Sequence, residues 1–337
     1  MHEKVLIIGG GLSGLLVSNA LRKRGVIVDV LDDGNNHSSR VAAGLVNPIS
    51  FRRTLLSWNA TLFYPCAKTF YEEIQKNATR AIIKELSLRR IFSSKEEVTT
   101  WKQRLFNPEF TPFLLPLVEE DAAFGPYGSG RVTGFCVDGE ALLNQLKSTQ
   151  NLIQKEFVPT EIDPEQGVYD GTKYDKIVFC CGYRNHENPF FKHLPVQATK
   201  GQLLLVEWNN SDENTSYHRK CFALPKGDKR FKLGATFEWG ELNLDTTQEA
   251  KEKLLSDFAS ISSDTLVVKD QVAGIRPTSP DRKPIIGLHP QYPKLGIFNG
   301  LGTKGYLTAP YLANHFVDHL LTNAPLDATL SLNRFER

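Results

Sequence analysis

Three glycines near the N-terminus, Gly9, Gly11 and Gly14, follow the spacing G-x-G-x-x-G. Glycines in this pattern permit a tight turn, a close approach of the backbone to a pyrophosphate, and close packing of a helix on a strand. Leu12 and Ser13 would then form the start of the helix, where free backbone N–H groups attract an anion. The spacing therefore predicts a site for a phosphate-bearing ligand.

Two acidic residues stand where such a site needs a carboxylate. Asp32 lies about 20 residues beyond the glycines, the distance at which a carboxylate reaches the ribose of a dinucleotide. Asp33 is the alternative residue for this role, but Asp32 directly ends the preceding apolar run. Together with the glycines, this acid predicts a bound dinucleotide.

The elements that must position these residues are a strand, a helix and a second strand. An apolar run over residues 4–8 leads into the glycines, and residues 26–31 form a second run of strand type. Between them, a helical pattern ends in the cationic residues 22–24 and Gly25, which favour the last turn and the stop of a helix. The sequence therefore predicts a β-α-β unit and an α/β fold.

The chain has 337 residues and a formal net charge of +2. At roughly 150 residues per domain this length predicts two domains, and 41% hydrophobic with 23% charged residues excludes disorder and fibrous repeats. The small net charge argues against nucleic acid or an anionic membrane as an obligate partner. The apolar stretch over residues 5–21 lacks the flanks and cleavage site of a signal peptide, so we expect no integral membrane segment.

Five cysteines are spread along the chain without a C-x-x-C pair. An odd number without such pairing disfavours a disulfide framework and a zinc ribbon, and it predicts a reducing, cytoplasmic location. The histidines show no metal-ligand spacing, so we expect no metal site.

Three further segments favour FAD over NAD as the dinucleotide. The small-residue stretch 38–48 could run close along an extended cofactor. Residues 174–182 have the pattern of a strand that ends in a small residue and a glycine. Residues 300–305, Gly-Leu-Gly-Thr-Lys-Gly, precede a predicted helix from about residue 306 to 321 and would form a second anion-attracting helix start.

Together these segments resemble the D-amino-acid oxidase (DAO) family of FAD-dependent oxidoreductases, which includes glycine oxidase, sarcosine oxidase and the flavin domain of the tRNA-modifying enzyme MnmC. The resemblance spans nearly the whole chain. Besides the N-terminal glycines, its marks are Lys200-Gly-Gln202, Ala223-Leu-Pro225, Leu233-Gly-Ala-Thr236, Gly274-Ile-Arg276-Pro277 and Pro284-Ile-Ile-Gly287.

The resemblance implies a Rossmann-like FAD-binding domain with a central parallel sheet, and a second, β-rich substrate domain. The FAD-binding domain would be discontinuous, over residues 1–80, 139–195 and 270–337. The substrate domain would combine residues 81–138, expected to be helical and basic, with residues 196–269, which contain several runs of strand type.

For the cofactor, the resemblance implies that the backbone of Val158 meets the adenine and that Gly182 approaches the pyrophosphate. The full implied FAD-binding set is Gly9, Gly11, Leu12, Ser13, Gly14, Asp32, Asp33, Arg40, Ala43, Gly44, Leu45, Val158, Cys181, Gly182, Arg276, Gly300, Gly302, Thr303, Lys304 and Gly305. Sarcosine oxidases attach FAD through a cysteine near the position of Gly274, and no cysteine follows Cys221 in this chain, so we expect noncovalent FAD.

Two cations are the expected catalytic residues. Arg276 matches the family arginine that holds the substrate carboxylate through two parallel hydrogen bonds, and pairing with Asp281 is its alternative role. Lys304, at a helix start, would stabilise negative charge on the reduced flavin, and a solvated surface lysine is the alternative. The expected substrate-binding residues are Arg276, Asn47, Arg52 and Phe222, the last near a position where several relatives carry a tyrosine.

The implied activity is transfer of a hydride to the flavin from the carbon next to an amine, in an amino acid or N-substituted amino acid. Two alternative activities are removal of a carboxymethyl group from a tRNA wobble uridine and dehydrogenation of a 2-hydroxy acid. An alternative of another class is a noncatalytic flavin-binding or electron-carrier protein. The expected partner is a small carboxylate-bearing amine, tRNA is not excluded, and the exact substrate, the electron acceptor and the oligomeric state stay open.

Overall fold

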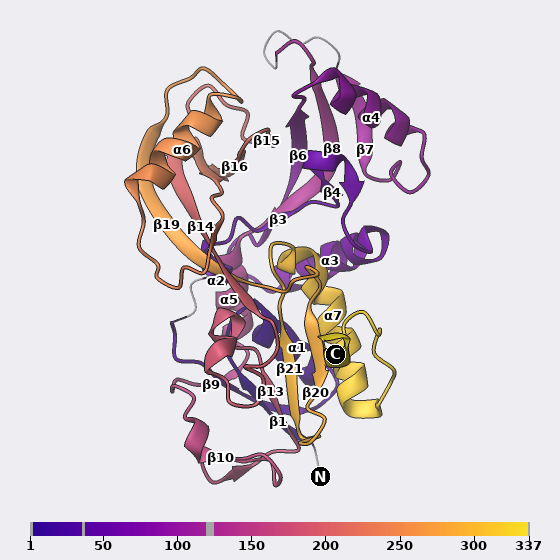
Figure 1. Ribbon diagram of the computed structural model, residues 1–337, viewed down its shortest axis with the longest axis vertical. Helices are drawn as coiled ribbons and strands as arrows, with labels where there is room; N and C mark the ends of the chain where they lie inside the picture. The colour runs from indigo at the N-terminus through magenta and orange to yellow at the C-terminus, as the bar shows by residue number, and fades with distance from the viewer. Residues whose placement is uncertain (1–2, 36–37, 119–124, 336–337) are drawn as a thin grey trace.

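The computed structural model describes residues 3–35, 38–118 and 125–335, which form two main sheets (Figure 1). The first is a six-stranded sheet in the order β20-β21-β13-β1-β2-β9, parallel except at β20. Its strands are β1 (Lys4–Ile8), β2 (Ile27–Leu31), β9 (Asn151–Ile153), β13 (Lys176–Phe179), β20 (Ile285–Leu288) and β21 (Leu295–Asn299). Because β1 lies between two parallel neighbours, its apolar run is almost wholly buried.

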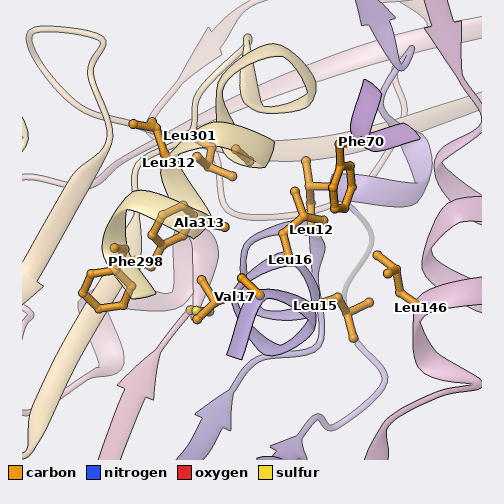
Figure 2. Close-up of a cluster of buried hydrophobic side chains, with 14 of the residues drawn as sticks. Leu12, Leu15, Leu16, Val17, Phe70, Leu146, Phe298, Leu301, Leu312 and Ala313 are labelled. Carbon is orange, nitrogen blue, oxygen red and sulfur yellow. The ribbon is translucent and has the colours of Figure 1, made fainter. Parts of the chain in front are cut away.

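Four helices pack beside this sheet: α1 (Leu12–Arg22), α3 (Ala60–Gln75), α5 (Gly139–Lys147) and α7 (Gly305–Thr322). Figure 2 shows their shared core, in which Leu15 and Leu16 of α1 approach side chains from the other helices and from β21. The labelled members are Leu12, Leu15, Leu16, Val17, Phe70, Leu146, Phe298, Leu301, Leu312 and Ala313. Each fully buried leucine contributes about 2 kcal/mol to the free energy of unfolding, so this shared core holds α1 and α7 in place.

The second sheet has ten strands in the order β18-β14-β17-β16-β15-β6-β8-β3, with β19 paired to β14 and β7 to β8. Two helices, α4 (Lys95–Leu105) and α6 (Gln248–Phe258), pack against it through Trp101, Leu254 and Phe258. Its strands are β3 (Leu45–Val46), β6 (Ile83–Ile91), β7 (Leu114–Val118), β8 (Ser129–Val137), β14 (Gln197–Glu207), β15 (Thr215–His218), β16 (Phe222–Gly227), β17 (Arg230–Gly234), β18 (Glu238–Trp239) and β19 (Val267–Thr278).

The remaining elements are short. They are α2 (Ser38–Val41), the strands β4 (Ile49–Ser50), β5 (Leu55–Leu56), β10 (Ile162–Asp163), β11 (Val168–Tyr169) and β12 (Thr172–Lys173), and the 3₁₀ turns η1 (Phe51–Arg53), η3 (Pro159–Glu161), η4 (Gly182–Glu187) and η5 (Leu332–Phe335). Of these, α2, η1, η3 and η4 contribute residues to the cavity described below.

The α/β fold with a Rossmann-like sheet is confirmed, but the expectation of a helical segment at 81–138 is wrong. Within its described residues this segment forms β6, β7 and β8, and α4 is its one α-helix of two turns or more. Lys, Glu, Arg and Leu favour helices locally, yet Leu86 and Leu88 alternate with less buried neighbours along β6 and bury one face of a strand.

The sheets divide the chain differently from the expected boundaries at two places. β19 pairs with β14 along almost its whole length, so residues 270–278, expected in the FAD-binding domain, lie in the ten-stranded sheet. β3, from the N-terminal part of the chain, pairs with β8 in that same sheet. The ten-stranded sheet thus contains strands from segments that were expected in the FAD-binding domain. The domain division therefore stays a prediction.

Candidate active site

A large cavity of about 1160 Å³ receives residues from both sheets. Its volume exceeds the roughly 300–1,000 Å³ of ordinary small-molecule sites, so it has room for a dinucleotide together with a small substrate. At one end the wall comes from the turns after β1, β2 and β13, and at the other from β15, β16 and β19. We call the first the cofactor end and the second the substrate end, after the roles expected from the sequence.

The glycine turn after β1 has the geometry that its spacing predicts. Gly9 has a φ of 107°, and a Cβ there would lie 2.5 Å from the carbonyl oxygen of Cys180. Gly11, which also lines the cavity, precedes α1 and offers no side-chain cap. The Leu12 N–H donates to Ser39 Oγ at 3.1 Å, and within residues 3–35, 38–118 and 125–335 the Gly11 and Ser13 N–H groups have no such side-chain acceptor. This helix N-terminus can therefore bind an anion in the cavity.

Gly14 has a packing role instead of a place in the cavity wall. A Cβ at this position would lie 1.9 Å from the carbonyl oxygen of Gly9. The third glycine of the pattern thus allows α1 to pack closely on the turn, as the spacing predicts.

The acids at the end of β2 are both held by cations. Asp32 is buried and accepts hydrogen bonds from the Gly10 N–H (3.1 Å) and from Lys147 Nζ (2.5 Å). Asp33 accepts from the Asn35 N–H (2.9 Å) and forms an ion pair with Arg184. Burial raises the pKa of the Asp33 carboxyl, but these two partners outweigh it and leave the pKa below its ordinary value. Both carboxylates line the cavity with fixed orientations.

Most of the other expected cofactor residues lie in the cavity wall. They are Ala43, Gly44, Leu45, Cys181, Gly182, Gly302, Thr303, Lys304 and Gly305. Gly44 has a φ of 73°, and its missing Cβ would lie 1.9 Å from the carbonyl oxygen of Val137, so the loop reaches the cavity only with a glycine there.

Besides Gly14, three expected cofactor residues are not in the wall. Arg40 is exposed at the end of α2, and Gly300 packs against Ile285. The backbone of Val158 already has partners: its N–H donates to Tyr169 Oη (3.2 Å) and its carbonyl accepts from the Glu161 N–H (3.1 Å). Its neighbours in sequence, Phe157 and Pro159, line the cavity instead, so adenine contact by Val158 stays a prediction.

Arg276 extends from β19 into the substrate end of the cavity. Its guanidinium stacks on Phe237, 4.6 Å from the ring centre, and makes one long contact of 3.5 Å with the Thr236 carbonyl oxygen. A Cβ at Gly201 would lie 2.2 Å from Arg276 Nη2, so the glycine of the Lys200-Gly-Gln202 motif makes room for this group. Burial lowers the pKa of Arg276 to about 10.

The alternative role of Arg276, an ion pair with Asp281, is not formed. Asp281 binds Arg334, with 2.8 Å between Oδ2 and Nε. Among the described residues Arg276 therefore has no carboxylate partner, although burying an unpaired cation is costly. The Arg276 guanidinium can therefore bind an anion at this end of the cavity.

Lys304 caps the N-terminus of α7 and also lacks a carboxylate partner in the described part of the chain. Its Nζ donates to the carbonyl oxygen of Asn47 at 2.8 Å, and burial lowers its pKa to about 8. It is thus a desolvated cation in the cavity wall and not a freely solvated surface lysine. Asn47 is itself buried, and its Oδ1 accepts from the Ile49 N–H at 2.8 Å, which fixes the loop that holds Lys304.

The substrate end contains residues that the sequence did not indicate. Phe222 lines the cavity as expected, whereas the side chain of Arg52 lies outside the described residues. Phe51, Arg90, His218 and Phe237 also belong to this part of the wall, as do the charged residues Arg219, Lys220, Lys253 and Asp257. Arg90 belongs to the segment that was expected to be helical, and His218 had no motif around it, so only their tertiary placement reveals them.

The described residues contain no group of three or more His, Cys, Asp or Glu side chains placed to hold a metal ion. No helix among them has the length and apolar character needed to cross a membrane.

A glycine turn, an open helix N-terminus, an acid after β2 and a large cavity facing a second sheet define a dinucleotide-binding redox protein. A family profile described as "FAD dependent oxidoreductase" (DAO) matches residues 4–319, and the chain belongs to this family. The residues present fit FAD: the glycine turn and the uncapped α1 suit its pyrophosphate, and the cavity has room for the rest.

The similar proteins include enzymes of two kinds. The chain is 23% identical to glycine oxidase of Pseudomonas aeruginosa over 97% of both proteins. It is 26% identical to the bifunctional protein MnmC of tRNA 5-methylaminomethyl-2-thiouridine biosynthesis from Idiomarina loihiensis, over 99% of this chain and 59% of that protein. The chain thus spans little more than half of MnmC.

Two solved structures share the fold closely. Glycine oxidase from Geobacillus kaustophilus has a TM-score of 0.80 at 20% identity, covering 98% of this chain and 99% of its own. L-proline dehydrogenase from P. horikoshii has a TM-score of 0.82 at 17% identity, covering 100% and 98%. The chain is therefore an oxidoreductase of the DAO fold, and the substrates in those names, glycine and proline, carry CH–NH₂ or CH–NH groups.

Proposed function

We propose that this protein oxidises a carboxylate-bearing amine, an amino acid or N-substituted amino acid, by transfer of a hydride from the carbon next to the nitrogen. The observation that carries the proposal is the partly buried guanidinium of Arg276, which lines a cavity suited to FAD and has no carboxylate partner among the described residues. A substrate carboxylate would supply the missing anion through two parallel hydrogen bonds.

Each end of the cavity has a separate task in this proposal. The α1 N-terminus and Asp32 would hold the pyrophosphate and a ribose, while Arg276 would fix the substrate carboxylate. Lys304 and the start of α7 would place positive charge beside the cofactor. Bound FAD supplies the hydride acceptor. The protein contributes position and electrostatic field, and this reaction needs no strong base.

Noncovalent binding of FAD is part of the proposal. Position 274, where sarcosine oxidases carry the attaching cysteine, is a glycine in this chain and offers no thiol. A Cβ added to Gly274 would lie 3.4 Å from the Val41 side chain. Cys181, which does line the cavity, has its pKa raised to about 12 by burial and stays a thiol at neutral pH. Acid or heat should release intact FAD from the yellow protein, and FAD that stays with the precipitate would contradict this.

A second candidate is the removal of a carboxymethyl group from a tRNA wobble uridine. The observation that favours it is the cavity mouth, where Phe237 is 59% exposed and where Arg219 and Lys220 add positive charge. An exposed aromatic ring beside cations could stack a nucleobase and bind a phosphate. The resemblance to MnmC supports this candidate, and the small net charge of the chain weighs against it.

The decisive experiment is anaerobic mixing of the holoprotein with a substrate panel while the flavin absorbance is followed. The panel contains glycine, sarcosine, proline, D-amino acids, 2-hydroxy acids and a carboxymethylaminomethyl-uridine tRNA. We expect an amino acid or N-substituted amino acid to bleach the flavin. Bleaching only by a hydroxy acid, or only by the tRNA, would replace the substrate assignment. Reduction by dithionite alone would favour an electron carrier.

The compartment and the assembly state stay predictions. All five cysteines are free, with Cys136, Cys180 and Cys221 buried, which agrees with the reducing, cytoplasmic location expected from their number. Fractionation of the native host would test it.

A further inference from the structure

His218 lies in the cavity wall and has none of the roles given above. It is the last residue of β15 and is only 7% exposed. Its ring centre lies 4.7 Å from that of Phe51 and 6.4 Å from that of Phe222, and all three residues line the substrate end. These two aromatic contacts hold the imidazole in one orientation.

The contacts of His218 allow an arrangement in which Nε2 carries the ring hydrogen. Nε2 lies 2.9 Å from Ser216 Oγ, and Ser216 Oγ lies 3.2 Å from the carbonyl oxygen of Ala223. When Ser216 donates its single hydroxyl hydrogen to Ala223, Nε2–H donates to Ser216 Oγ and a lone pair is left on Nδ1. This tautomer satisfies all three groups, and it is part of the inference below.

The Nδ1 atom has no hydrogen-bond partner among the described residues, and the His218 side chain lines the cavity. In the tautomer with the hydrogen on Nε2, Nδ1 is therefore an acceptor that a ligand in the cavity can satisfy.

The groups around His218 keep it neutral. Arg90 on β6 and Lys304 before α7 are the charged groups that act on it from the packed elements, and Arg219 and Lys220 follow it in sequence. Arg90 is held by Glu97 at 2.6 Å. Burial and then these two cations lower the pKa of His218 to about 3. The same cations disfavour a second positive charge, such as an ammonium, beside them.

We propose that His218 Nδ1 accepts a hydrogen bond from the amine N–H of the substrate, and that the site takes this amine in its neutral form. This inference rests on the proposed function. The ammonium proton leaves to bulk water before binding, and His218 accepts no proton. An N–H directed at Nδ1 orients the nitrogen lone pair, whose donation assists hydride loss from the adjacent carbon.

Two substitutions separate the acceptor at Nδ1 from the donor at Nε2. His218→Gln can keep an N–H donor for Ser216 but has no acceptor at the Nδ1 position. His218→Asn can place its amide oxygen near the Nδ1 position but loses the Ser216 bond. With each holoprotein, the Kd of the amine substrate is obtained from saturation of anaerobic flavin reduction. The Kd of acetate, which has a carboxylate and no amine, is obtained from the flavin spectrum.

We expect His218→Gln to raise the Kd of the amine about fivefold, the effect of losing one neutral hydrogen bond, and His218→Asn to raise it less. The Kd of acetate should stay unchanged in both variants. An unchanged amine Kd in His218→Gln, a larger loss in His218→Asn, or an equal loss for acetate would overturn the inference. A wild-type protein that no amine reduces would instead contradict the proposed function.

A second measurement does not depend on activity. In ¹⁵N-histidine-labelled holoprotein, the NMR signals of His218, assigned by their loss in His218→Gln, should show a protonated Nε2, a bare Nδ1 and no titration between pH 5 and 8. A proton on Nδ1, or titration in this range, would overturn the inference.

Discussion

The two ends of the cavity treat charge in opposite ways. At the cofactor end, Asp32 is paired with Lys147 and Asp33 with Arg184. At the substrate end, Arg90 is paired with Glu97, whereas Arg276 has only a carbonyl oxygen and an aromatic ring as partners in the described chain. Lys304, which would lie beside the cofactor, has only the carbonyl oxygen of Asn47. The carboxylates at the cofactor end already have cationic partners before a ligand binds, and these ion pairs hold them in fixed orientations. The positive charge of Arg276 is uncompensated, and an anionic ligand would relieve the cost of burying it.

The largest expected effect breaks the cofactor end by packing. Gly14→Ala would place a Cβ 1.9 Å from the Gly9 carbonyl oxygen and push α1 off the turn. We expect a loss of about 3 kcal/mol in the free energy of unfolding, measured by denaturant titration of the apoprotein. Gly25→Ala is the matched control, since nothing lies within 4 Å of its added Cβ and only its φ of 80° is strained. That control should cost about 1 kcal/mol, and an equal cost for both would contradict this account.

The next effect breaks the substrate end by chemistry. Arg276→Lys keeps the charge but loses the planar fork, so the Kd of a carboxylate substrate or of acetate should rise by about 2 kcal/mol, roughly 30-fold. The affinity for FAD should change little, because Arg276 lies at the other end. Unchanged binding of both substrate and acetate would return Arg276 to a structural role.

A smaller effect is expected on FAD affinity when the carboxylate of Asp32 is removed. Asp32→Asn should weaken FAD binding about tenfold, or 1.4 kcal/mol, because the ribose loses a charged acceptor. Fluorescence quenching of added FAD gives the Kd. Asp281→Asn also removes a carboxylate paired with a cation, but Asp281 does not line the cavity, so this control should keep the wild-type affinity. Equal losses in both variants would show a general effect of charge.

The smallest effect tests the unpaired lysine through pH. Burial lowers the pKa of Lys304 to about 8, so its ammonium is charged below pH 8 and neutral above. Lys304→Met should lower the two-electron midpoint potential of bound FAD by about 30 mV, or 1.4 kcal/mol, at pH 7. The difference from wild type should vanish above pH 9. Lys232→Met is the control, because burial also lowers the pKa of Lys232 to about 8, but Lys232 itself does not line the cavity and its Nζ binds the carbonyl oxygens of Val41 and Ala42. A potential difference that persists at pH 10 would contradict a role for the Lys304 charge.

Local patterns indicated the glycine turn and the acid at the cofactor end. The turn from Gly9 to Gly14 and the acid after β2 lie within one β-α-β unit, where spacing along the chain sets spacing in the structure. The substrate end joins β6, β15, β16, β19 and the start of α7, which lie far apart in sequence. Arg276 and Lys304 were indicated there only by a family resemblance, and Arg90 and His218 were not indicated at all.

The sequence by itself determined the glycine turn, the family and the presence of two candidate cations, because motif spacing and residue type carry that information. Only the tertiary structure decided the state of those cations. It showed that Asp281 is taken by Arg334 and not by Arg276, and that Lys304 is desolvated against Asn47. Partner choice and desolvation depend on distances between distant segments, and no local pattern encodes them. For the same reason, the Nδ1 atom of His218 could be proposed as an acceptor only after β15 and β16 had placed Ser216 beside Ala223.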